Sequence, residues 1–114
     1  MILMGDFNCG ERSPVVRFVK GETVELGGES KTSVMHMLDT FRVVLPDEKS
    51  AATFNGFRAP RFDSTGTVEI GEKIDYIFVT PNLKTKDAEI IRTNVNGRYP
   101  TDHYPIRATV EFAN

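Results

Sequence analysis

The pattern of apolar and polar residues predicts strands in four parts of the chain. Residues 73–79 are apolar on both faces apart from the carboxylate of Asp75, which predicts a central strand covered on both sides. Residues 106–112 alternate between apolar and polar side chains, as is typical of a half-buried strand. Residues 88–95 predict another strand, and the apolar run over residues 1–4 predicts an opening strand.

Two segments carry helix signals. Pro14 follows the capping residue Ser13, and the apolar residues after it predict a short helix that ends at Gly21. Apolar residues recur at roughly helical spacing over 34–44, which predicts a second helix that ends before Pro46.

The segments between these elements are polar or rich in turn residues. Residues 27–33 predict a polar loop, and residues 46–72 predict a loop-rich stretch with a short strand at 53–54. His36 falls within the predicted second helix, on its flank, where a structural role is favoured over a functional one.

The strongest candidate for chemistry is an adjacent acid and imidazole, Asp102 and His103, bracketed by Pro100 and Pro105. The prolines stiffen this segment as a loop, and neighbours on a rigid turn can converge on one site, whereas neighbours on a strand diverge. We therefore predict a reactive site here. The alternative is that Asp102 caps the loop and His103 is a structural histidine.

Asp75 needs a partner, because an unpaired buried charge is costly. His103 is the histidine on a loop with catalytic character, so we predict an Asp75–His103 hydrogen bond. This bond would fix the tautomer of the imidazole and raise its basicity. The alternative is a structural ion pair between Asp75 and Lys73 or an arginine.

A second acidic segment follows the opening strand, in Gly5-Asp6-Phe7-Asn8. If the chain stays extended there, Asp6 and Asn8 share one side while Phe7 points into the core. The alternative is that Asp6 caps the turn over residues 7–9.

Residues 5–8, 74–79 and 101–105 together resemble, in this order, the last three signature motifs of the endonuclease/exonuclease/phosphatase superfamily, the DNase I-like hydrolases. Residues 53–57 resemble a weaker marker between the first and second. The resemblance implies an α/β (α+β) fold: the C-terminal half of a four-layer DNase I-like α/β sandwich, with mostly antiparallel sheet and flanking helices.

The resemblance also implies that half of the domain is absent. In the superfamily the motif at residues 5–8 falls near the middle of a domain of roughly 250 residues. The preceding half supplies an asparagine, a glutamate metal ligand and usually another histidine, and no segment here resembles those motifs. Residues 1–114 are thus expected to form a single partial domain. Its exposed apolar sheet face would bind the missing N-terminal half or drive self-association.

The activity implied by the resemblance is metal-dependent phosphoester hydrolysis. Asp6 would orient and deprotonate the attacking water, with Asn8 holding Asp6 or the phosphate. His103, oriented by Asp75, would donate to a non-bridging phosphate oxygen, and Asp102 would lie on the metal side. Oxygen-rich ligands suit Mg²⁺ or Mn²⁺ better than zinc.

Substrate contacts are expected from Asn55, which is placed to border the substrate pocket, and from Arg98, which lies five residues before His103. Guanidinium forks match phosphate oxygens. Arg58 and Arg61 are further candidates for which a solvated role is favoured. Cys9 stands alone, so no disulfide framework exists, and no base is placed to activate it.

Composition narrows the function only slightly. The net charge of −2 gives no basic footprint for nucleic acid, which favours a small or exposed phosphoester. No apolar stretch approaches the ~18 residues of a membrane span, and localisation stays open. The family resemblance does not choose among nucleic acids, phosphoinositides and sphingomyelin-type substrates. The alternative class is a non-catalytic fragment or a binding module that retains the scaffold.

Overall fold

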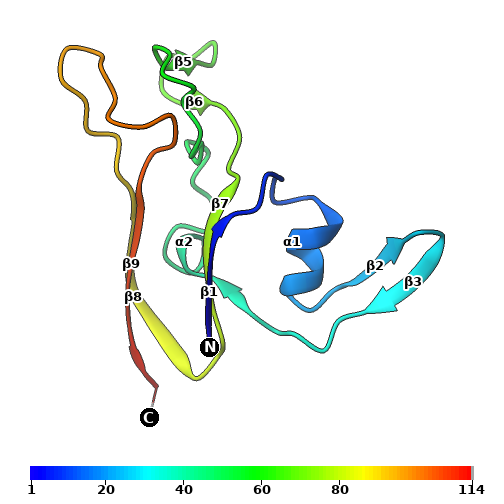
Figure 1. The fold of residues 1–114 in the computed structure, drawn as a ribbon. Coiled ribbons are helices and arrows are strands. Elements are labelled where there is room, and N and C mark those ends of the chain that lie inside the picture. Colours follow the sequence, from blue (N-terminus) through cyan, green and yellow to red (C-terminus); the bar gives the residue numbers. More distant parts are fainter. Residues whose placement is uncertain (114) are drawn as a thin grey trace.

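The computed structural model describes residues 1–113, and its centre is a three-stranded antiparallel sheet (Figure 1). β1 (Ile2–Asp6) and β4 (Leu38–Asp39) both pair with β7 (Asp75–Val79), which is the middle strand. The predicted opening strand and the predicted central strand over 73–79 are thus confirmed. The apolar side chains on both faces of β7 explain its central place.

A short helix, α1 (Pro14–Val19), covers one face of this sheet. Ser13 caps it as predicted, because its hydroxyl oxygen accepts the backbone N–H of Val16 at 3.3 Å. The first core cluster is formed by Val16, Val19, Met37, Tyr76 and Phe78.

The second unit is a long hairpin of β8 (Leu83–Ile90) and β9 (Ile106–Phe112), against which α2 (Thr40–Val44) packs. β9 has the predicted bounds. β8 begins five residues before the predicted strand at 88–95 and ends at Ile90. A bulge between Thr85 and Asp87 interrupts the alternation of apolar and polar residues, which hid the first half of the strand from the sequence pattern.

The predicted helix over 34–44 is largely wrong. Residues 34–37 lie in no helix or strand, Leu38 and Asp39 form the strand β4, and the helix starts only at Thr40. Asp39 marks this switch, because its backbone is extended and its Oδ1 accepts the N–H of Phe41 at 3.0 Å as a helix cap. His36 therefore precedes β4 and does not lie on a helix.

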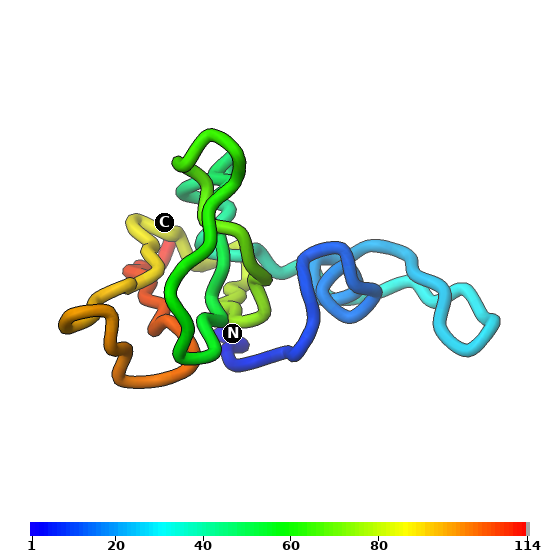
Figure 2. Tube along the Cα trace, turned by 90° about the horizontal axis from the view of Figure 1, so that it is seen from above, coloured from blue at the N-terminus to red at the C-terminus, as the bar shows by residue number. Residues whose placement is uncertain are grey.

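Two predicted loops contain hairpins. β2 (Thr23–Leu26) and β3 (Glu29–Thr32) pair across Gly27 and Gly28, so the predicted loop over 27–33 is wrong. Both glycines have positive φ, as a two-residue hairpin turn requires. β5 (Arg61–Phe62) and β6 (Glu69–Ile70) form a small hairpin within the loop-rich stretch. Figure 2 shows that the β2–β3 hairpin extends away from the rest of the molecule.

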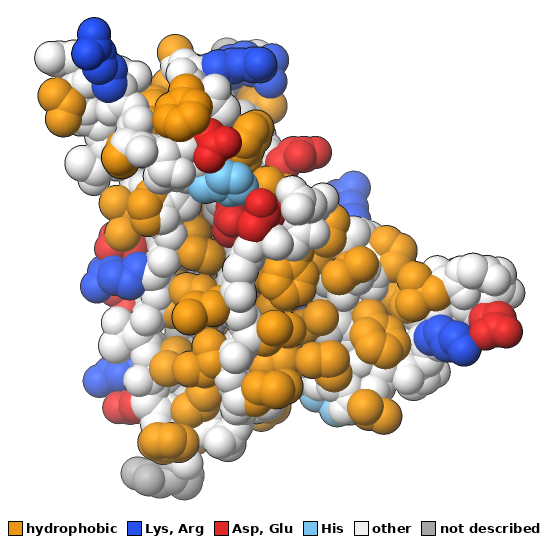
Figure 3. Space-filling model, in the orientation of Figure 1, with side chains coloured by type: hydrophobic (Ala, Val, Ile, Leu, Met, Phe, Trp, Pro, Cys, Tyr) orange, Lys and Arg blue, Asp and Glu red, His pale blue; other side chains and the backbone are white. Residues whose placement is uncertain are grey.

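One face of the central sheet and the free edge of β1 are apolar and exposed. Met4 keeps 69% of its surface accessible, and Ile2 and Leu38 are also exposed. In the described part of the chain, β1 pairs with β7 alone and leaves its other edge open. Figure 3 shows this hydrophobic surface. Within residues 1–113, no helix has the length and apolar character needed to cross a membrane.

Candidate active site

Asp6 and Asp75 face each other at one end of the central sheet. Asp6 is the last residue of β1, Asp75 is the first residue of β7, and the antiparallel register pairs them directly. Like charges in directly opposite positions destabilise a sheet. This pair therefore requires a positive group close by.

The imidazole of His103 lies between these two carboxylates. Its Nδ1 is 2.8 Å from Asp75 Oδ2, and its Nε2 is 3.7 Å from Asp6 Oδ2 and 4.0 Å from Asp102 Oδ1. An ionised carboxylate can only accept a hydrogen bond, so Nδ1 carries a proton and donates it to Asp75. The predicted hydrogen bond between Asp75 and His103 is present. Figure 3 shows a histidine between acidic side chains at the border of the hydrophobic surface.

The surrounding carboxylates favour the protonated form of His103. The hydrogen bond to Asp75 is the main cause that raises the pKa of His103 above its ordinary value of 6.5. Partial burial opposes this shift, and the charges of Asp75, Asp6 and Asp102 reinforce it. The imidazolium form therefore persists to higher pH than that of a free histidine, with Nε2–H available as a donor.

The alternative partner for Asp75 is engaged elsewhere. Lys73 Nζ lies 3.0 Å from Asp39 Oδ2 in a buried ion pair, and it reaches only the backbone carbonyl of Asp75, at 3.2 Å. The carboxylate of Asp75 is thus left to His103.

The segment after Ala52 holds the loop that carries Asp102 and His103. The backbone N–H groups of Asn55 and Gly56 donate to the carbonyl of Asp102 at 2.8 and 3.0 Å. The side-chain amide of Asn55 donates to Thr101 O at 3.1 Å. Phe54 and His103 form an isolated antiparallel β-bridge. The strand predicted at 53–54 is therefore limited to this single bridge. Asn55, expected to contact substrate, therefore holds the loop that carries Asp102 and His103 and also borders a neighbouring pocket.

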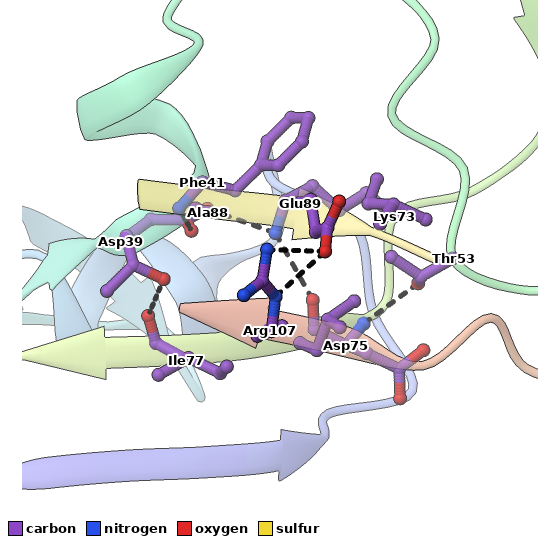
Figure 4. Close-up of a pocket in the computed structure, with 12 residues that line it drawn as sticks. Asp39, Phe41, Thr53, Lys73, Asp75, Ile77, Ala88, Glu89 and Arg107 are labelled. Atoms are coloured by element: carbon purple, nitrogen blue, oxygen red, sulfur yellow. Dashed lines mark hydrogen bonds and ion pairs between the residues drawn. The ribbon is translucent and has the colours of Figure 1, made fainter. Parts of the chain in front are cut away.

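Thr53 joins the start of β7, which carries Asp75, to the residue that follows His103. It belongs to the weak marker over residues 53–57, but the family resemblance assigns no role to its side chain. Its hydroxyl oxygen accepts the N–H groups of Ile74 and Asp75 at 2.9 and 3.1 Å. Its carbonyl accepts the N–H of Tyr104 at 2.6 Å. Figure 4 shows Thr53 beside the first residue of β7. The side chain is fully buried, so no water replaces these bonds.

Replacing Thr53 with valine should therefore destabilise the protein by about 2 kcal/mol, because two backbone donors lose their acceptor. Thr53→Ser keeps the hydroxyl and loses one methyl group, which should cost only about 1 kcal/mol. Urea unfolding of the two variants measures the difference. Equal losses of unfolding free energy in both variants would show that the hydrogen bonds to the Thr53 hydroxyl do not stabilise the fold.

Tyr104 anchors the other end of the loop. Its hydroxyl donates to the buried carboxylate of Glu69 at 2.6 Å, and Arg92 Nε pairs with the same carboxylate at 3.0 Å. Burial is the main cause that raises the pKa of the Tyr104 hydroxyl, so it stays a donor.

Asn8 does not follow the predicted extended course. β1 ends at Asp6, and Asn8 adopts a positive φ of 52°. Its N–H donates to Asp6 Oδ1 at 2.8 Å, so Asp6 also makes the turn-capping contact that was the structural alternative. Phe7 packs as predicted, with its ring 5.4 Å from those of Tyr76 and Phe78.

Arg98 lies apart from the acidic cluster. It closes the turn that begins at Val95, and its side chain is exposed. Among the described residues, no hydrogen bond or ion pair links its guanidinium to another side chain. Its expected contact with substrate stays a prediction.

The acidic side chains fit a divalent cation. Ligand atoms of Asp6, Asp75 and His103 lie within 4.8 Å of one another. The 2.8 Å contact between Asp75 and Nδ1 leaves no room for an ion between them, so an ion would lie on the Nε2 side of the ring. Asp6 Oδ2 and Asp102 Oδ1 both lie on this side, at 3.7 and 4.0 Å from Nε2. Mg²⁺ is usually bound by one or two carboxylates, with waters and substrate phosphates as further ligands. The family resemblance implies for Asp6 only the role of orienting and deprotonating the attacking water. Its position in the structure also makes it a candidate ligand of the metal ion.

Two hollows border this site. One, of about 220 Å³, is lined by Met4, Asp6, Asp75 and Ile106, and opens beside the acidic cluster. The other, of about 10 Å³, lies beneath Asp75 between β7 and the β8–β9 hairpin (Figure 4). Because that volume is about enough for one water, the second hollow cannot admit a substrate.

Comparisons with known proteins give a family and a similar fold. Residues 1–103 match the family model described as the endonuclease/exonuclease/phosphatase family. No curated protein sequence matches the chain. The fold is similar to the crystal structure of a conserved protein of unknown function from Enterococcus faecalis V583, with a TM-score of 0.61 and 21% sequence identity. That match covers 98% of this chain and 36% of the other, so this chain spans about a third of that protein's length.

Proposed function

The chain belongs to the endonuclease/exonuclease/phosphatase family, and from this premise we propose that it provides the water-activating and proton-donating part of a metal-dependent phosphoester hydrolase. The observation that carries the proposal is the single imidazole held between Asp75 and Asp6 at one end of the sheet. Such a group can donate a proton at one atom while a neighbouring carboxylate accepts one.

Asp6 acts as the base toward the attacking water. Its Oδ1 is held by the N–H of Asn8, which leaves Oδ2 on the side of His103. The exposed Asn8 amide orients the phosphate or the water next to this oxygen. The carboxylate is 38% exposed, so water can reach it.

His103 donates from Nε2 to a non-bridging phosphate oxygen as negative charge develops there. Asp75 holds Nδ1 and keeps the ring in one orientation. Asp6 and Asp102 would hold a Mg²⁺ or Mn²⁺ ion, and its positive charge would stabilise the phosphate oxygens.

We further propose that this chain works as part of a larger domain. Two observations support this: the similar structure is longer, and the apolar face around Met4 is exposed. The proposed partner is the segment that bears the family's glutamate, and self-association through the same face is the competing occupant.

The test is hydrolysis of bis(4-nitrophenyl) phosphate by this chain, alone and with a supplied segment that carries the glutamate motif. We expect turnover that requires Mg²⁺ and stops when EDTA removes it. Asp6→Asn should lower the rate on the order of 100-fold, because the base is lost. Glu25→Gln, an equal change of charge at an exposed residue of β2, is the matched control.

Turnover that is unchanged by EDTA or by Asp6→Asn would refute the proposed site. A folded chain that stays inactive even with the supplied segment would favour the alternative, a binding module that retains the family scaffold.

A further inference from the structure

Two arginines without an acidic partner lie close together beside the proposed active site. Arg58 and Arg61 lie in the segment between Phe54 and the β5–β6 hairpin, and within residues 1–113 their side chains make no hydrogen bond or ion pair. Four other arginines are paired with carboxylates: Arg17, Arg42, Arg92 and Arg107. Among the described residues Arg12 and Arg98 also have no acidic partner, but neither of them lines the pocket that Arg58 and Arg61 share. An unpaired guanidinium is available to an anionic ligand.

Both arginines line a pocket of about 260 Å³, which we call the arginine pocket; its other walls include Phe54, Asn55, Glu72 and Tyr104. The pocket starts one aromatic ring away from His103. The ring of Phe54 packs edge-to-face on the imidazole, with 5.2 Å between centroids, and Tyr104 directly follows His103. The arginine pocket therefore lies close to His103.

The balance of charge in the arginine pocket favours an anion. Two carboxylates line it, Glu69 and Glu72. Glu69 is buried, pairs with Arg92 at 3.0 Å and accepts a hydrogen bond from Tyr104, so its charge is neutralised. Glu72 alone then faces the two free arginines.

The turn that precedes Arg58 is held in a strained shape. Gly56 and Phe57 both have φ of 61°, and Asn55 O accepts the N–H of Arg58 at 3.0 Å. Positive φ is unfavourable for an aromatic residue, and the Phe57 ring gains no packing, since it is 64% exposed. The Asn55 side chain joins this turn to the loop that carries Asp102 and His103, through Thr101 and Phe57. The backbone from which the Arg58 side chain extends is therefore tied to that loop.

We propose that the arginine pocket binds a second phosphate group of the substrate through Arg58 and Arg61, while the phosphate to be hydrolysed lies at His103. This inference rests on the proposed function and narrows its substrate class. The substrate would carry two phosphates joined by a short spacer, as in a nucleotide chain or a phosphorylated polyol.

The test compares ligands that differ by one phosphate, by NMR titration of the ¹⁵N-labelled chain in Mg²⁺. The pairs are thymidine 5′-monophosphate with 5′-phosphorylated thymidine dinucleotide, and inositol 1-phosphate with inositol 1,4-bisphosphate. The ligand with two phosphates should bind at least about tenfold more tightly, the gain typical of charge-assisted hydrogen bonds. The double variant Arg58→Gln/Arg61→Gln should remove that gain and leave the affinity for the monophosphates unchanged.

Arg17→Gln/Lys31→Gln is the matched control, because it removes two exposed positive charges far from the arginine pocket, each from an exposed ion pair. A gain in the dinucleotide alone supports a nucleotide chain, and a gain in both pairs supports recognition of phosphate itself. Equal affinities within both pairs, or a gain in affinity that survives in the Arg58/Arg61 double variant, would refute phosphate binding in the arginine pocket but not the proposed function. Absence of binding by all four ligands would overturn the proposed function as well.

Discussion

Replacing Asp75 with asparagine should reduce phosphoester turnover by a factor on the order of 10² to 10⁴, the range for loss of a positioned acid or base. The amide keeps the shape of the side chain but removes the charge that favours imidazolium. It can also present N–H to Nδ1, which would turn the ring or select the other tautomer. His103 then loses both its orientation and its proton.

The pH dependence gives a sharper readout of the same change. Asp75 is the main cause that raises the pKa of His103, so the proton on Nε2 persists above pH 6.5. If that proton is donated in the reaction, activity falls as pH rises through the raised pKa. In Asp75→Asn the fall should begin at lower pH.

The contribution of the Asp75–His103 pair to folding stability also falls as the pH rises. The folded state binds this proton more tightly than the unfolded chain, so the contribution is fully present below about pH 6.5. It is lost as pH rises through the raised pKa of folded His103.

An NMR titration of the His103 ring measures this pKa without any need for turnover, with His36→Gln used to assign the two histidines. The Asp102→Asn variant is the control, because its carboxylate acts on Nε2 only from 4.0 Å. It should lower the pKa of His103 less than Asp75→Asn does. A pKa that stays unchanged in Asp75→Asn would contradict the role of this carboxylate.

Replacing Asp39 with alanine should destabilise the fold by about 3–5 kcal/mol, the usual cost when one partner of a buried ion pair is removed. The side chains of Asp39 and Lys73 are only 2% and 5% exposed, and Nζ lies 3.0 Å from Oδ2. The change leaves Lys73 as an unpaired buried cation. It also removes the cap of α2, because Asp39 Oδ1 accepts the N–H of Phe41.

The dependence of this loss on pH follows from Lys73. Burial lowers the pKa of the Lys73 ammonium, and the attraction of Asp39 opposes that shift. Without Asp39 the pKa falls further, so the unfolded state binds the proton more readily. The destabilisation should therefore be largest near neutral pH and shrink as the pH approaches the ordinary value of 10.5.

Urea unfolding at pH 7 and pH 9.5 measures both effects. Asp47→Ala, at an exposed position, is the control and should change stability by less than about 0.5 kcal/mol. The double variant Asp39→Asn/Lys73→Met keeps a cap acceptor and removes the unpaired charge, so it should recover much of the loss. A double variant as unstable as Asp39→Ala would show that the buried charge is not the cause.

Part of this site could be predicted from the sequence because local patterns carry the relevant physics. A carboxylate on a strand that is apolar on both faces needs a partner, and one histidine lies on a rigid loop. That reasoning identified Asp75 and His103 without knowledge of their distance. The strand over 106–112 and the capped helix at Ser13 were predictable for the same reason, because alternation and capping depend on neighbouring residues.

The wrong secondary-structure predictions concern short segments whose residue pattern is compatible with more than one kind of element. The apolar spacing over 34–44 suits a helix, yet Leu38 and Asp39 pair with β7, and the helix begins only after them. Pairing with a distant strand overrides local propensity, because it buries the same side chains and also satisfies the backbone. The bulge in β8 shifted a predicted strand in a similar way, since it breaks the alternation on which the prediction depends.

By itself the sequence determined which residue types carry the chemistry, the order of the main elements and the need for a partner to Asp75. Tertiary structure alone decided the contacts between segments far apart in the chain. These are the register that opposes Asp6 to Asp75, the hydrogen bonds of Thr53 to Asp75 and Tyr104, and the pocket that Arg58 and Arg61 line together with Phe54 and Tyr104. Register and loop placement depend on the packing of the whole fold, whereas charge and hydrophobicity are properties of single residues and their near neighbours.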